Sequence, residues 1–456
     1  MIKRYEKYKE SGLDWITKIP SGWELGKLKF NASLIISTVD RHELEDEISV
    51  SVCHYPQAYN NEKINKKTVL SSGTCNEKEF ENFKLKKGQI IITKDSETSN
   101  DIGVPTFVEE DIPNAVCGYH LAMINANENL IHSPFLFRYL QSKNVNYYFD
   151  TKSNGVTRFG LGKPAMENLP IPIPSLEEQT KITQYLDHQT AIIDKLIQQK
   201  EKLIELLKEK RQAVINEAVT KGLNLNTKMK DSGIEWLGEV PQQWNPVQIR
   251  YLNKKVGSGV TPKGGAEVYT EEGVIFIRSQ NVHFEGLRLD DVVKIDFDTH
   301  EKMSGSKVMY KDVLLNITGA SIGRCCVVEI KDEMNVNQHV CIIRPTRKIL
   351  SEYLNLVLQS NVGQVQIKLG TTGGNREGLT FEAIKEFIIP LPDLKEQEEI
   401  LNTIQSSLNR YYELENLNTI QIDKMKEYRQ SIISEAVTGK IDVREWKLSE
   451  PQMVTD

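Results

Sequence analysis

A regular spacing of apolar side chains runs through the middle of the chain, from Pro174 to Lys221. Counting from Ile182 in alternate steps of four and three residues gives mostly apolar positions. A helix with such a heptad stripe buries one face against a partner helix. The spacing therefore predicts one long helix, with a buried seam at Ile182, Leu186, Ile193, Leu196, Leu203 and Leu207.

The same pattern returns 218 positions later in the chain. Ile171-Pro172-Ile173-Pro174 matches Ile389-Pro390-Leu391-Pro392, and Glu217-Ala218-Val219-Thr220 matches Glu435-Ala436-Val437-Thr438, without any gap between the two matches. Constant spacing over this distance indicates that the length of the helix is itself fixed. The second copy predicts a second seam at Ile400, Ile404, Tyr411, Leu414, Met425 and Tyr428.

Two polar pairs interrupt both seams at equivalent positions, namely Gln189 with Ser407 and Lys200 with Asn418. One interpretation is that these residues set the register and the choice of partner helix. The other is that the seam is shallow and partly solvated, so that polar residues cost little there. The sequence leaves both interpretations open.

The linker after the first helix limits how the two helices can run. A helix of about 46 residues is ~70 Å long, whereas residues 222–230 extend to only ~30 Å. The chain cannot return along the first helix within this linker, so we expect the second helix to run antiparallel to the first. A globular domain is then expected at each end of a rod.

The start of the chain is also repeated, at an offset of 221. Ser11-Gly12-Leu13-Asp14-Trp15, followed by Pro20 and Trp23, returns as Ser232-Gly233-Ile234-Glu235-Trp236, Pro241 and Trp244. We interpret the tryptophans as core residues that seat each domain. The expected α+β fold is a tandem duplication with pseudo-two-fold symmetry: a domain over residues 1–170, a long helix over 171–221, a domain over 222–388, a long helix over 389–442 and a tail over 443–456.

Shorter patterns predict the interiors of the two domains. Strands are expected at Asp46–Val52, Gln89–Thr93, Gly273–Arg278, Val313–Ile317 and Val340–Ile343, and helices at Pro134–Gln141 and Glu352–Gln359. The middles of the two halves differ much more than their ends. We find no counterpart of residues 94–99 in residues 318–324, although Gly103 corresponds to Gly323.

A matched loop closes each domain, because residues 155–161 align at 218 with residues 373–379. Each loop keeps an arginine among glycines, Arg158 in the first and Arg376 in the second. Glycine allows a close approach to phosphate, and arginine offers a planar donor fork to phosphate or guanine. A capping or ion-pairing role for these arginines is an equal alternative. Residues 257–265 are also rich in glycine but lack the Gly-Lys-Ser/Thr ending of a nucleotide-binding loop.

Composition narrows the classes of protein. With 39% hydrophobic and 26% charged residues and no apolar run of membrane-spanning length, we expect a cytoplasmic protein. The net charge of −6 argues against a simple basic DNA-coating protein but leaves room for local basic grooves. The six cysteines contain no Cys-x-x-Cys pair, so reduced, buried thiols are expected, and the Cys117 to His120 spacing is a weak metal signal.

The doubled Ile-Pro-x-Pro-x-Leu-x-x-Gln start of the long helix, its Glu-Ala-Val-Thr end, the doubled Ser-Gly-x-x-Trp motif and residues 257–265 resemble the specificity subunit of type I restriction-modification systems. The resemblance covers nearly the whole chain. It implies that each domain is a target-recognition domain that reads one half of a split sequence in double-stranded DNA, and that the helices act as a ruler. It also implies two methyltransferase (modification) subunits docked on the helices, with restriction subunits joining through them.

The residues agree with a non-catalytic subunit that holds no cofactor or metal of its own. We find no Asp/Asn-Pro-Pro-Tyr/Phe motif for methyl transfer, so S-adenosylmethionine, ATP and magnesium are expected on the partner subunits. Two rival interpretations are a nuclease that uses Asp312, Glu329 and Lys331, and a coiled-coil scaffold without nucleic acid. The candidate DNA-binding residues are Lys94, Arg158, Lys263, Arg278, Gln280, Arg324 and Arg376.

Overall fold

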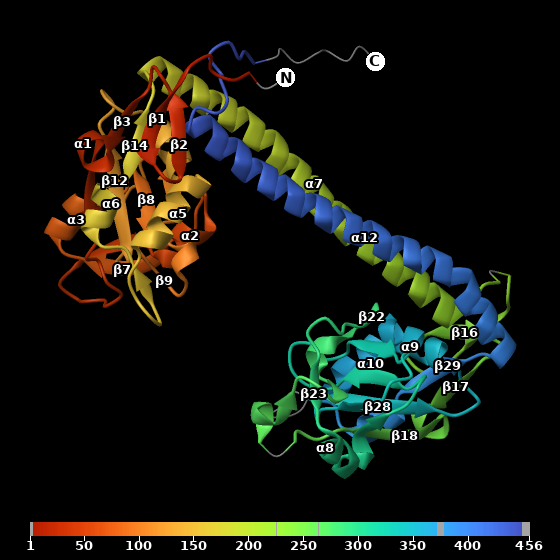
Figure 1. Cartoon of the computed structure of the whole chain (residues 1–456). Helices are drawn as coiled ribbons and strands as arrows, with labels where there is room; N and C mark the ends of the chain where they lie inside the picture. The colour runs from red at the N-terminus through yellow and green to blue at the C-terminus, as the bar shows by residue number, and fades with distance from the viewer. Residues whose placement is uncertain (1–2, 225, 263, 372–377, 449–456) are drawn as a thin grey trace, which may run out of the picture. The chain divides into compact units, whose positions relative to one another are not determined.

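The computed structural model describes residues 3–224, 226–262, 264–371 and 378–448. The chain divides into two compact units (Figure 1). Unit 1 contains residues 1–199 and 421–456, and unit 2 contains residues 200–420. Each unit has a globular part, here called the first head (residues 3–173) and the second head (residues 229–391).

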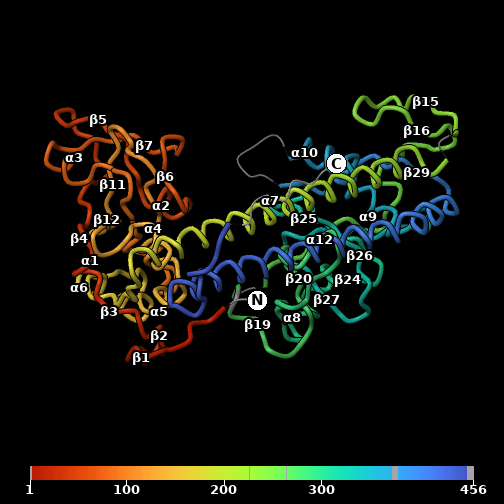
Figure 2. Tube along the Cα trace, turned by 90° about the horizontal axis from the view of Figure 1, so that it is seen from above, coloured from red at the N-terminus to blue at the C-terminus, as the bar shows by residue number. Residues whose placement is uncertain are grey.

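Two long helices confirm the main prediction from the sequence. Helix α7 (Leu176–Lys221) has 46 residues and α12 (Leu394–Val437) has 44. They run side by side in Figures 1 and 2. In unit 1, Asp194 of α7 pairs with Arg429 of α12. In unit 2, Lys200 Nζ donates to Asn418 Oδ1 at 3.1 Å, and Arg211 lies 2.9 Å from Glu415. The residue numbers of the contacting positions increase along α7 as those of their partners decrease along α12. The two helices are therefore antiparallel within each unit.

The contacts between the helices also repeat at 218. The residue 218 positions after Asp194 is Tyr412, and the residue 218 positions after Arg211 is Arg429. Arg429 pairs with Asp194, while the Arg211 guanidinium lies 4.3 Å from the centre of the Tyr412 ring. Lys200 and Asn418 are each other's equivalents, and they contact one another. The pairing therefore has the internal two-fold character that the duplication predicted.

The buried seam differs from the predicted heptad. Leu196, Leu203 and Tyr428 are 41%, 43% and 50% exposed, whereas Ile197 is only 8% exposed. Ile182, Ile193, Ile204 and Ile215 follow each other at intervals of 11 and point inward or lie half-buried, and Ile400, Tyr411, Ile422 and Ile433 repeat this spacing. An 11-residue repeat fits a nearly straight helix, whereas a heptad stripe drifts by ~20° per repeat unless the helices supercoil to the left. The heptad prediction was therefore wrong at Leu196, Leu203 and Tyr428.

The remaining predicted seam residues lie on the inward side. Ile182, Leu186, Ile400 and Ile404 are buried, and the others are half-buried, namely Leu207, Tyr411, Leu414 and Met425. Ser407 is exposed, so it does not interrupt the seam as predicted. Leu408 takes the buried position beside it.

The first head is built around two larger sheets, with additional two-stranded sheets and helices packed against them. The five-stranded sheet has the order β4-β12-β8-β10-β6 and the three-stranded sheet the order β11-β5-β7. Ile90 and Ile92 of β8 face the core that contains the long helices, whereas Ile91 faces the core shared with the second sheet. The bounds are β1 (Tyr8–Leu13), β2 (Ile16–Pro20), β3 (Glu24–Lys27), α1 (Leu28–Asn31), β4 (Ala32–Ile36), β5 (Ile48–Cys53), α2 (Tyr55–Asn60), β6 (Lys63–Ile64), β7 (Ser71–Cys75), α3 (Glu77–Phe83), β8 (Ile90–Thr93), β9 (Asp95–Ser96), β10 (Pro105–Val108), β11 (Ala115–Cys117), β12 (Leu121–Ala126), α4 (Ser133–Leu140), α5 (Lys143–Lys152), β13 (Phe159–Gly160), α6 (Lys163–Glu167) and β14 (Pro170–Ile173).

The second head repeats this plan with different strand numbers. A four-stranded sheet has the order β18-β28-β25-β26, and a five-stranded sheet the order β19-β23-β20-β27-β24. The bounds are β15 (Met229–Asp231), β16 (Glu239–Pro241), β17 (Asn245–Gln248), β18 (Asn253–Ser258), β19 (Tyr269–Thr270), β20 (Val274–Ile277), β21 (Val282–His283), β22 (Gly286–Leu287), β23 (Val293–Ile295), α8 (Phe297–Lys302), β24 (Lys307–Val308), β25 (Val313–Asn316), β26 (Cys325–Val327), β27 (Met334–Val336), β28 (Val340–Pro345), α9 (Ser351–Gln359), α10 (Asn361–Thr371), α11 (Phe381–Glu386) and β29 (Ile388–Leu391). Each strand and helix predicted inside the heads is present, with ends that differ by a few residues.

Each head is attached to both long helices by the same set of contacts. Trp23 and Trp244 are fully buried, as predicted, and each lies against the glycine that ends a long helix, Gly439 in unit 1 and Gly222 in unit 2. Both glycines have positive φ, 75° and 72°, which a side chain would strain. A Cβ at either one would also meet the tryptophan ring at 3.2 Å.

Amide side chains of the helices complete the attachment. Gln179 accepts from the His132 amide at 2.7 Å, and its equivalent Gln397 accepts from the Leu350 amide at 2.9 Å. At the other helix ends, Gln430 donates to the Gln141 carbonyl in unit 1, and Gln212 donates to the Gln359 carbonyl at 3.1 Å in unit 2. All four pairs obey the 218 offset. The duplication thus extends to individual hydrogen bonds.

Two predictions from composition are also answered. All six cysteines are buried and free of disulfides. None of the helices in the described part of the chain has an apolar stretch long enough to cross a bilayer.

The observed seam register can be tested with two adjacent alanine substitutions. Ile197→Ala should lower the free energy of unfolding by about 2–4 kcal/mol, because it leaves a cavity in the seam. Leu196→Ala should cost less than about 1 kcal/mol, because that side chain is exposed. Urea unfolding of the two variants measures both values. An equal loss from Leu196→Ala would restore the heptad register.

Candidate nucleic-acid interface

The central strand of the first head ends at a cluster of polar residues. Strand β8 ends at Thr93, and Lys94, Asp95 and His120 follow at the same edge of the sheet. Lys94 Nζ lies 2.6 Å from Asp95 Oδ2, and His120 Nδ1 contacts the same oxygen. Although burial would raise the pKa of Asp95, the hydrogen bonds from Lys94 and His120 hold that pKa below its usual value. Asp95 is therefore an anionic acceptor between two donors.

The second head carries the same backbone arrangement with other side chains. Lys94 N–H donates to the His120 carbonyl at 3.0 Å, and Ile317 N–H donates to the His339 carbonyl at 3.0 Å. Thr318 therefore stands where the first head has Asp95, and its hydroxyl contacts His339 Nδ1 at 2.5 Å. Residues 94 and 95 thus have backbone counterparts in residues 317 and 318, which corrects the prediction from the sequence for these two positions. The side chains at these positions differ completely, which is why the sequences show no match.

The glycine pair was predicted correctly. Gly103 N–H donates to the Thr93 carbonyl and Gly323 N–H donates to the Asn316 carbonyl, both at 2.9 Å. Thr93 and Asn316 each end the central strand of their head. The two glycines have φ of 77° and 87°. They therefore close the same turn beside each strand end.

The matched loops lie beside these strand ends. Leu161 N–H donates to the Lys94 carbonyl at 2.7 Å, and Leu379 N–H donates to the Ile317 carbonyl at 2.8 Å. Strand β13 pairs with β9, which places the exposed Arg158 next to Asp95 and Ser96. Arg376, at the equivalent position, lies outside the described residues.

Two tyrosines that the sequence did not single out extend this surface in the first head. Tyr55 and Tyr59 of α2 stack with ring centres 5.5 Å apart. Burial raises the pKa of Tyr55, whereas the nearby Arg158 acts in the opposite direction. A hydrogen bond to Asp101, 2.7 Å long, raises the pKa of Tyr59 to about 12. Both tyrosines therefore remain neutral, and Tyr55 lies near Arg158.

Three of the predicted residues of the second head come together around Asn316. The Asn316 amide donates to the Ser279 carbonyl at 2.8 Å, and its N–H donates to the Arg324 carbonyl at 2.8 Å. The loop of Arg278 and Gln280 and the loop of Arg324 therefore meet at the strand end. Lys263 lies outside the described residues.

The polar groups of these three residues are used to different degrees. Arg278 donates to the Asp291 carbonyl at 2.9 Å, and Gln280 donates to the Asp291 carboxylate at 2.8 Å. Within the described part of the chain, the Arg324 guanidinium makes no hydrogen bond or ion pair. Arg324 and Arg158 are thus the predicted arginines whose donors remain available.

The residues of the alternative nuclease site make contacts with other side chains of the second head. Asp312 is 1% exposed, and both of its oxygens accept from Arg344 at 2.8 Å. Glu329 pairs with Lys311 at 3.2 Å, and Lys331 lies over the Tyr310 ring. Among the described residues, no group of three metal-binding side chains comes together. The nuclease interpretation is therefore not supported.

Sequence reasoning missed Tyr55, Tyr59, Asp95 and His120 as members of one surface. They come from three separate segments, α2, β9 and the residue before β12, which meet only in the folded head. The one local signal is the spacing of Tyr55 and Tyr59, which places both on the same face of a helix. The proximity of Tyr55 to Arg158 arises because Tyr55 lies beside Ser96 of β9, which pairs with β13, and it has no signature in the sequence.

Comparison with known proteins places this arrangement in a family. The family model described as the type I restriction modification DNA specificity domain matches twice, at residues 39–206 and 248–424. The EcoBI type I restriction enzyme specificity subunit of Escherichia coli is 24% identical over 355 residues, covering 75% of this chain and 72% of that protein. The putative MjaX specificity subunit of Methanocaldococcus jannaschii is 23% identical and covers 97% and 100%.

A solved structure shares the fold. A chain from work on complex assembly and conformational transition of the type I R-M system superposes with a TM-score of 0.67 at 15% identity, covering 93% of this chain and 99% of the other. The two family-model matches together span more than half of the sequence, one in each half of the duplication. The chain therefore belongs to the type I restriction-modification DNA specificity family.

Proposed function

We propose that this protein is the DNA sequence-specificity subunit of a type I restriction-modification complex, in which each head reads one part of a bipartite target. The observation that carries the proposal is the duplicated helix pair bearing two heads whose backbones match and whose strand-end side chains differ. Two readers with one frame and unlike surfaces suit a target made of two unlike half-sites. The subunit itself is a recognition subunit and carries out no catalysis.

The strand-end clusters supply suitable chemistry for reading DNA. In the first head, the Asp95 carboxylate can accept from an amino group of cytosine or adenine, while Arg158 can donate to phosphate or guanine. Tyr55 and Tyr59 add neutral donors and apolar faces. In the second head we assign Arg324 as a free donor, and Arg278 and Gln280 as residues that shape the loop or read bases after releasing Asp291. Lys263 and Arg376 stay in the proposal on the sequence alone.

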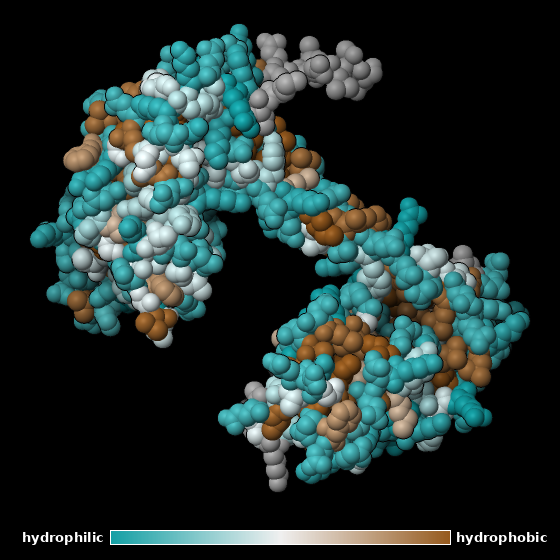
Figure 3. Space-filling model, in the orientation of Figure 1, coloured by the Kyte–Doolittle hydropathy of each residue, from teal (hydrophilic) through white to brown (hydrophobic). Residues whose placement is uncertain are grey.

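The outer faces of the long helices support docking of modification subunits. Aliphatic side chains remain exposed on them, including Leu196 and Leu203 of the predicted heptad seam, and Figure 3 shows apolar patches along the helix pair. These residues are Ile192, Leu196, Leu203, Leu206, Leu417 and Ile420. We propose that two modification subunits cover these positions and carry S-adenosylmethionine, and that restriction subunits with ATP and magnesium join through them in the cytoplasm.

The central experiment is single-molecule methylation mapping of cells that carry this subunit with its modification subunits. We expect methylated adenines in a split sequence with two fixed half-sites and a fixed gap. A contiguous target, or no sequence-specific methylation by the reconstituted complex, would contradict the proposal.

Lengthening both helices should lengthen the gap in the target. The design inserts a second copy of residues 195–205 in α7 and of residues 413–423 in α12, which keeps the 11-residue seam in phase. Eleven residues add ~16 Å, so the accepted gap should grow by up to about 5 base pairs while both half-sites stay the same. Methylation mapping reads both outcomes. An unchanged gap with full activity would show that the helices do not set the distance.

Substitution of Arg158 tests the first reading surface. Arg158→Ala should weaken DNA binding, and Arg158→Lys separates the two possible contacts. If Arg158 contacts phosphate, the alanine variant should lose similar affinity for all DNA sequences. The slope of log affinity against log salt concentration should fall by about 1, and lysine should restore both the affinity and the slope. If it reads a base, lysine should not restore selectivity at the first half-site. Fluorescence anisotropy of the assembled complex with both variants measures affinity and slope, and unchanged values would remove Arg158 from the interface.

A further inference from the structure

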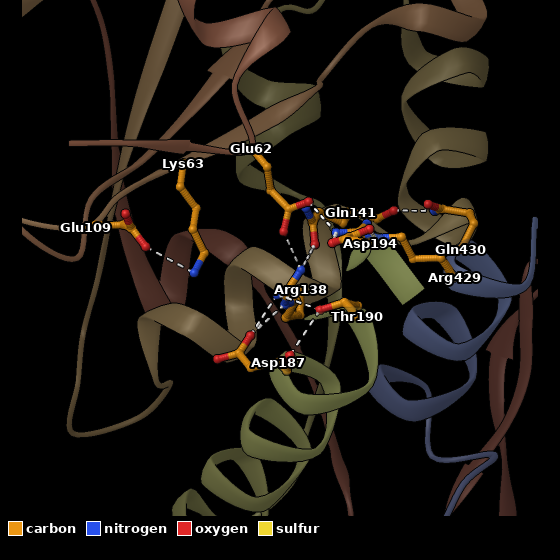
Figure 4. Close-up of polar contacts among 10 residues, drawn as sticks. All are labelled: Glu62, Lys63, Glu109, Arg138, Gln141, Asp187, Thr190, Asp194, Arg429 and Gln430. Carbon is orange, nitrogen blue, oxygen red and sulfur yellow. Dashed lines mark hydrogen bonds and ion pairs between the residues drawn. The ribbon is translucent and has the colours of Figure 1, made fainter. Parts of the chain in front are cut away.

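Five charged residues of unit 1 form a cluster between the first head and the long helices (Figure 4). We call them the charge clamp: Glu62 between α2 and β6, Arg138 on α4, Asp187 and Asp194 on α7, and Arg429 on α12. Figure 4 shows the two arginines approaching Glu62 from different helices. The cluster therefore links the head to both long helices.

Arg138 is the buried centre of the head side of the clamp, with its side chain 3% exposed. Its Nη1 donates to Glu62 at 2.7 Å and to Gln141 at 2.8 Å, and its Nη2 donates to Asp187 at 2.7 Å. A guanidinium has a rigid, planar set of donors. The contacts of Arg138 therefore fix the angle at which α4 meets α7.

Arg429 is the helix side of the clamp. Its Nε donates to Asp194 at 2.8 Å, and its Nη2 donates to the second oxygen of Glu62. The two oxygens of Glu62 thus accept from arginines of different helices, one of the head and one of α12. Burial would raise the pKa of Glu62, but the two arginines outweigh burial and hold that pKa below its usual value. Glu62 remains an anion between two cations.

The equivalent place in unit 2 has different chemistry. Subtracting 218 from Leu356, Gln405, Leu408 and Tyr412 gives Arg138, Asp187, Thr190 and Asp194. In unit 2 these residues line a cleft of about 190 Å³ with mixed polar and apolar walls, together with Leu401 and Ile404. Arg211, the equivalent of Arg429, pairs with Glu415 of the long helix α12. Among the described residues of unit 2, no ion pair joins Arg211 to the second head.

We propose that the charge clamp is a positioning device that fixes the orientation of the first head on the helix pair and thereby restricts the gap that the complex accepts between its half-sites. This inference rests on the proposed function. In the described part of the chain, no hydrogen bond or ion pair joins the clamp to Lys94, Asp95 or His120, and the clamp needs no contact with DNA. They act through the angle of the head on α7 and α12, which direct ion pairs define more narrowly than an apolar contact does.

The test compares two clamp variants with one matched control in the complete complex with modification subunits. Glu62→Gln removes the anion that joins the arginines. Arg429→Gln removes only the contacts of α12 and leaves Arg138 paired with Glu62 and Asp187, so the head keeps its contact with α7. Glu109→Gln is the control, because Glu109 pairs with Lys63 at 3.1 Å within the same head and reaches neither long helix (Figure 4).

Methylation mapping on a library of targets with gaps of every length gives the result. Both clamp variants should methylate targets whose gap is one base pair shorter or longer at least about tenfold more than the unmodified complex does, since a hydrogen bond to a charged group commonly shifts an equilibrium by that much. Both half-sites should be unchanged, and the control should behave as the unmodified complex.

Two outcomes would overturn the inference. One is a single unchanged gap in both variants. The other is an equal loss of methylation at every gap, which would mean that the clamp only stabilises the fold. If the unmodified subunit instead directs methylation to a contiguous sequence, the proposed function itself is wrong and this inference falls with it.

Discussion

The antiparallel seam between α7 and α12 is the constraint on which the rest of the structure depends. Each residue of one helix has an equivalent 218 positions away on the other, and Lys200 with Asn418 marks the point where equivalent residues meet. On either side of that point the same pairs recur with the helices exchanged, as Asp194 with Arg429 and Tyr412 with Arg211. Insertion in one helix alone would put one set of pairs out of phase. The lengths of the two helices are therefore coupled.

The seam also explains why the two heads can differ so much. Each head is attached by contacts that come in matched pairs, such as Gln179 with Gln397 and Trp23 with Trp244. These contacts involve backbone groups and buried rings at the helix ends, far along the chain from the strand-end loops. Side chains such as Asp95 and Thr318 can therefore change without disturbing the attachment. Recognition chemistry and architecture are carried by separate sets of residues.

The sequence predicted the long helices, their direction and the duplicated attachment, because a strict repeat and a short linker leave few arrangements. The prediction from the sequence failed for features that depend on the path of the backbone and not on the type of side chain. Leu196 fits a heptad as well as Ile197 fits an 11-residue repeat, and only the straightness of the helices separates them. The match of residues 94 and 95 with 317 and 318 is a match of hydrogen bonds without similar side chains. Arg278 and Gln280 were reasonable as polar donors, but their common partner Asp291 lies in a separate loop that no spacing connects to them.

The contrast between the two head attachments follows from how different interactions depend on direction. The free energy gained by burying apolar surface depends little on the angle between the two packed elements. A buried guanidinium with several carboxylate partners, by contrast, forms its hydrogen bonds in few orientations. Removal of one partner from such a cluster also leaves a charge in a poorly solvated place, so the arrangement resists partial opening. The first unit has this directional chemistry where the second has a cleft of mixed polar and apolar lining, with Leu356, Leu408 and Tyr412 in its wall. Equivalent positions of the two halves therefore hold different interactions, a network of ion pairs in the first unit and a cleft in the second.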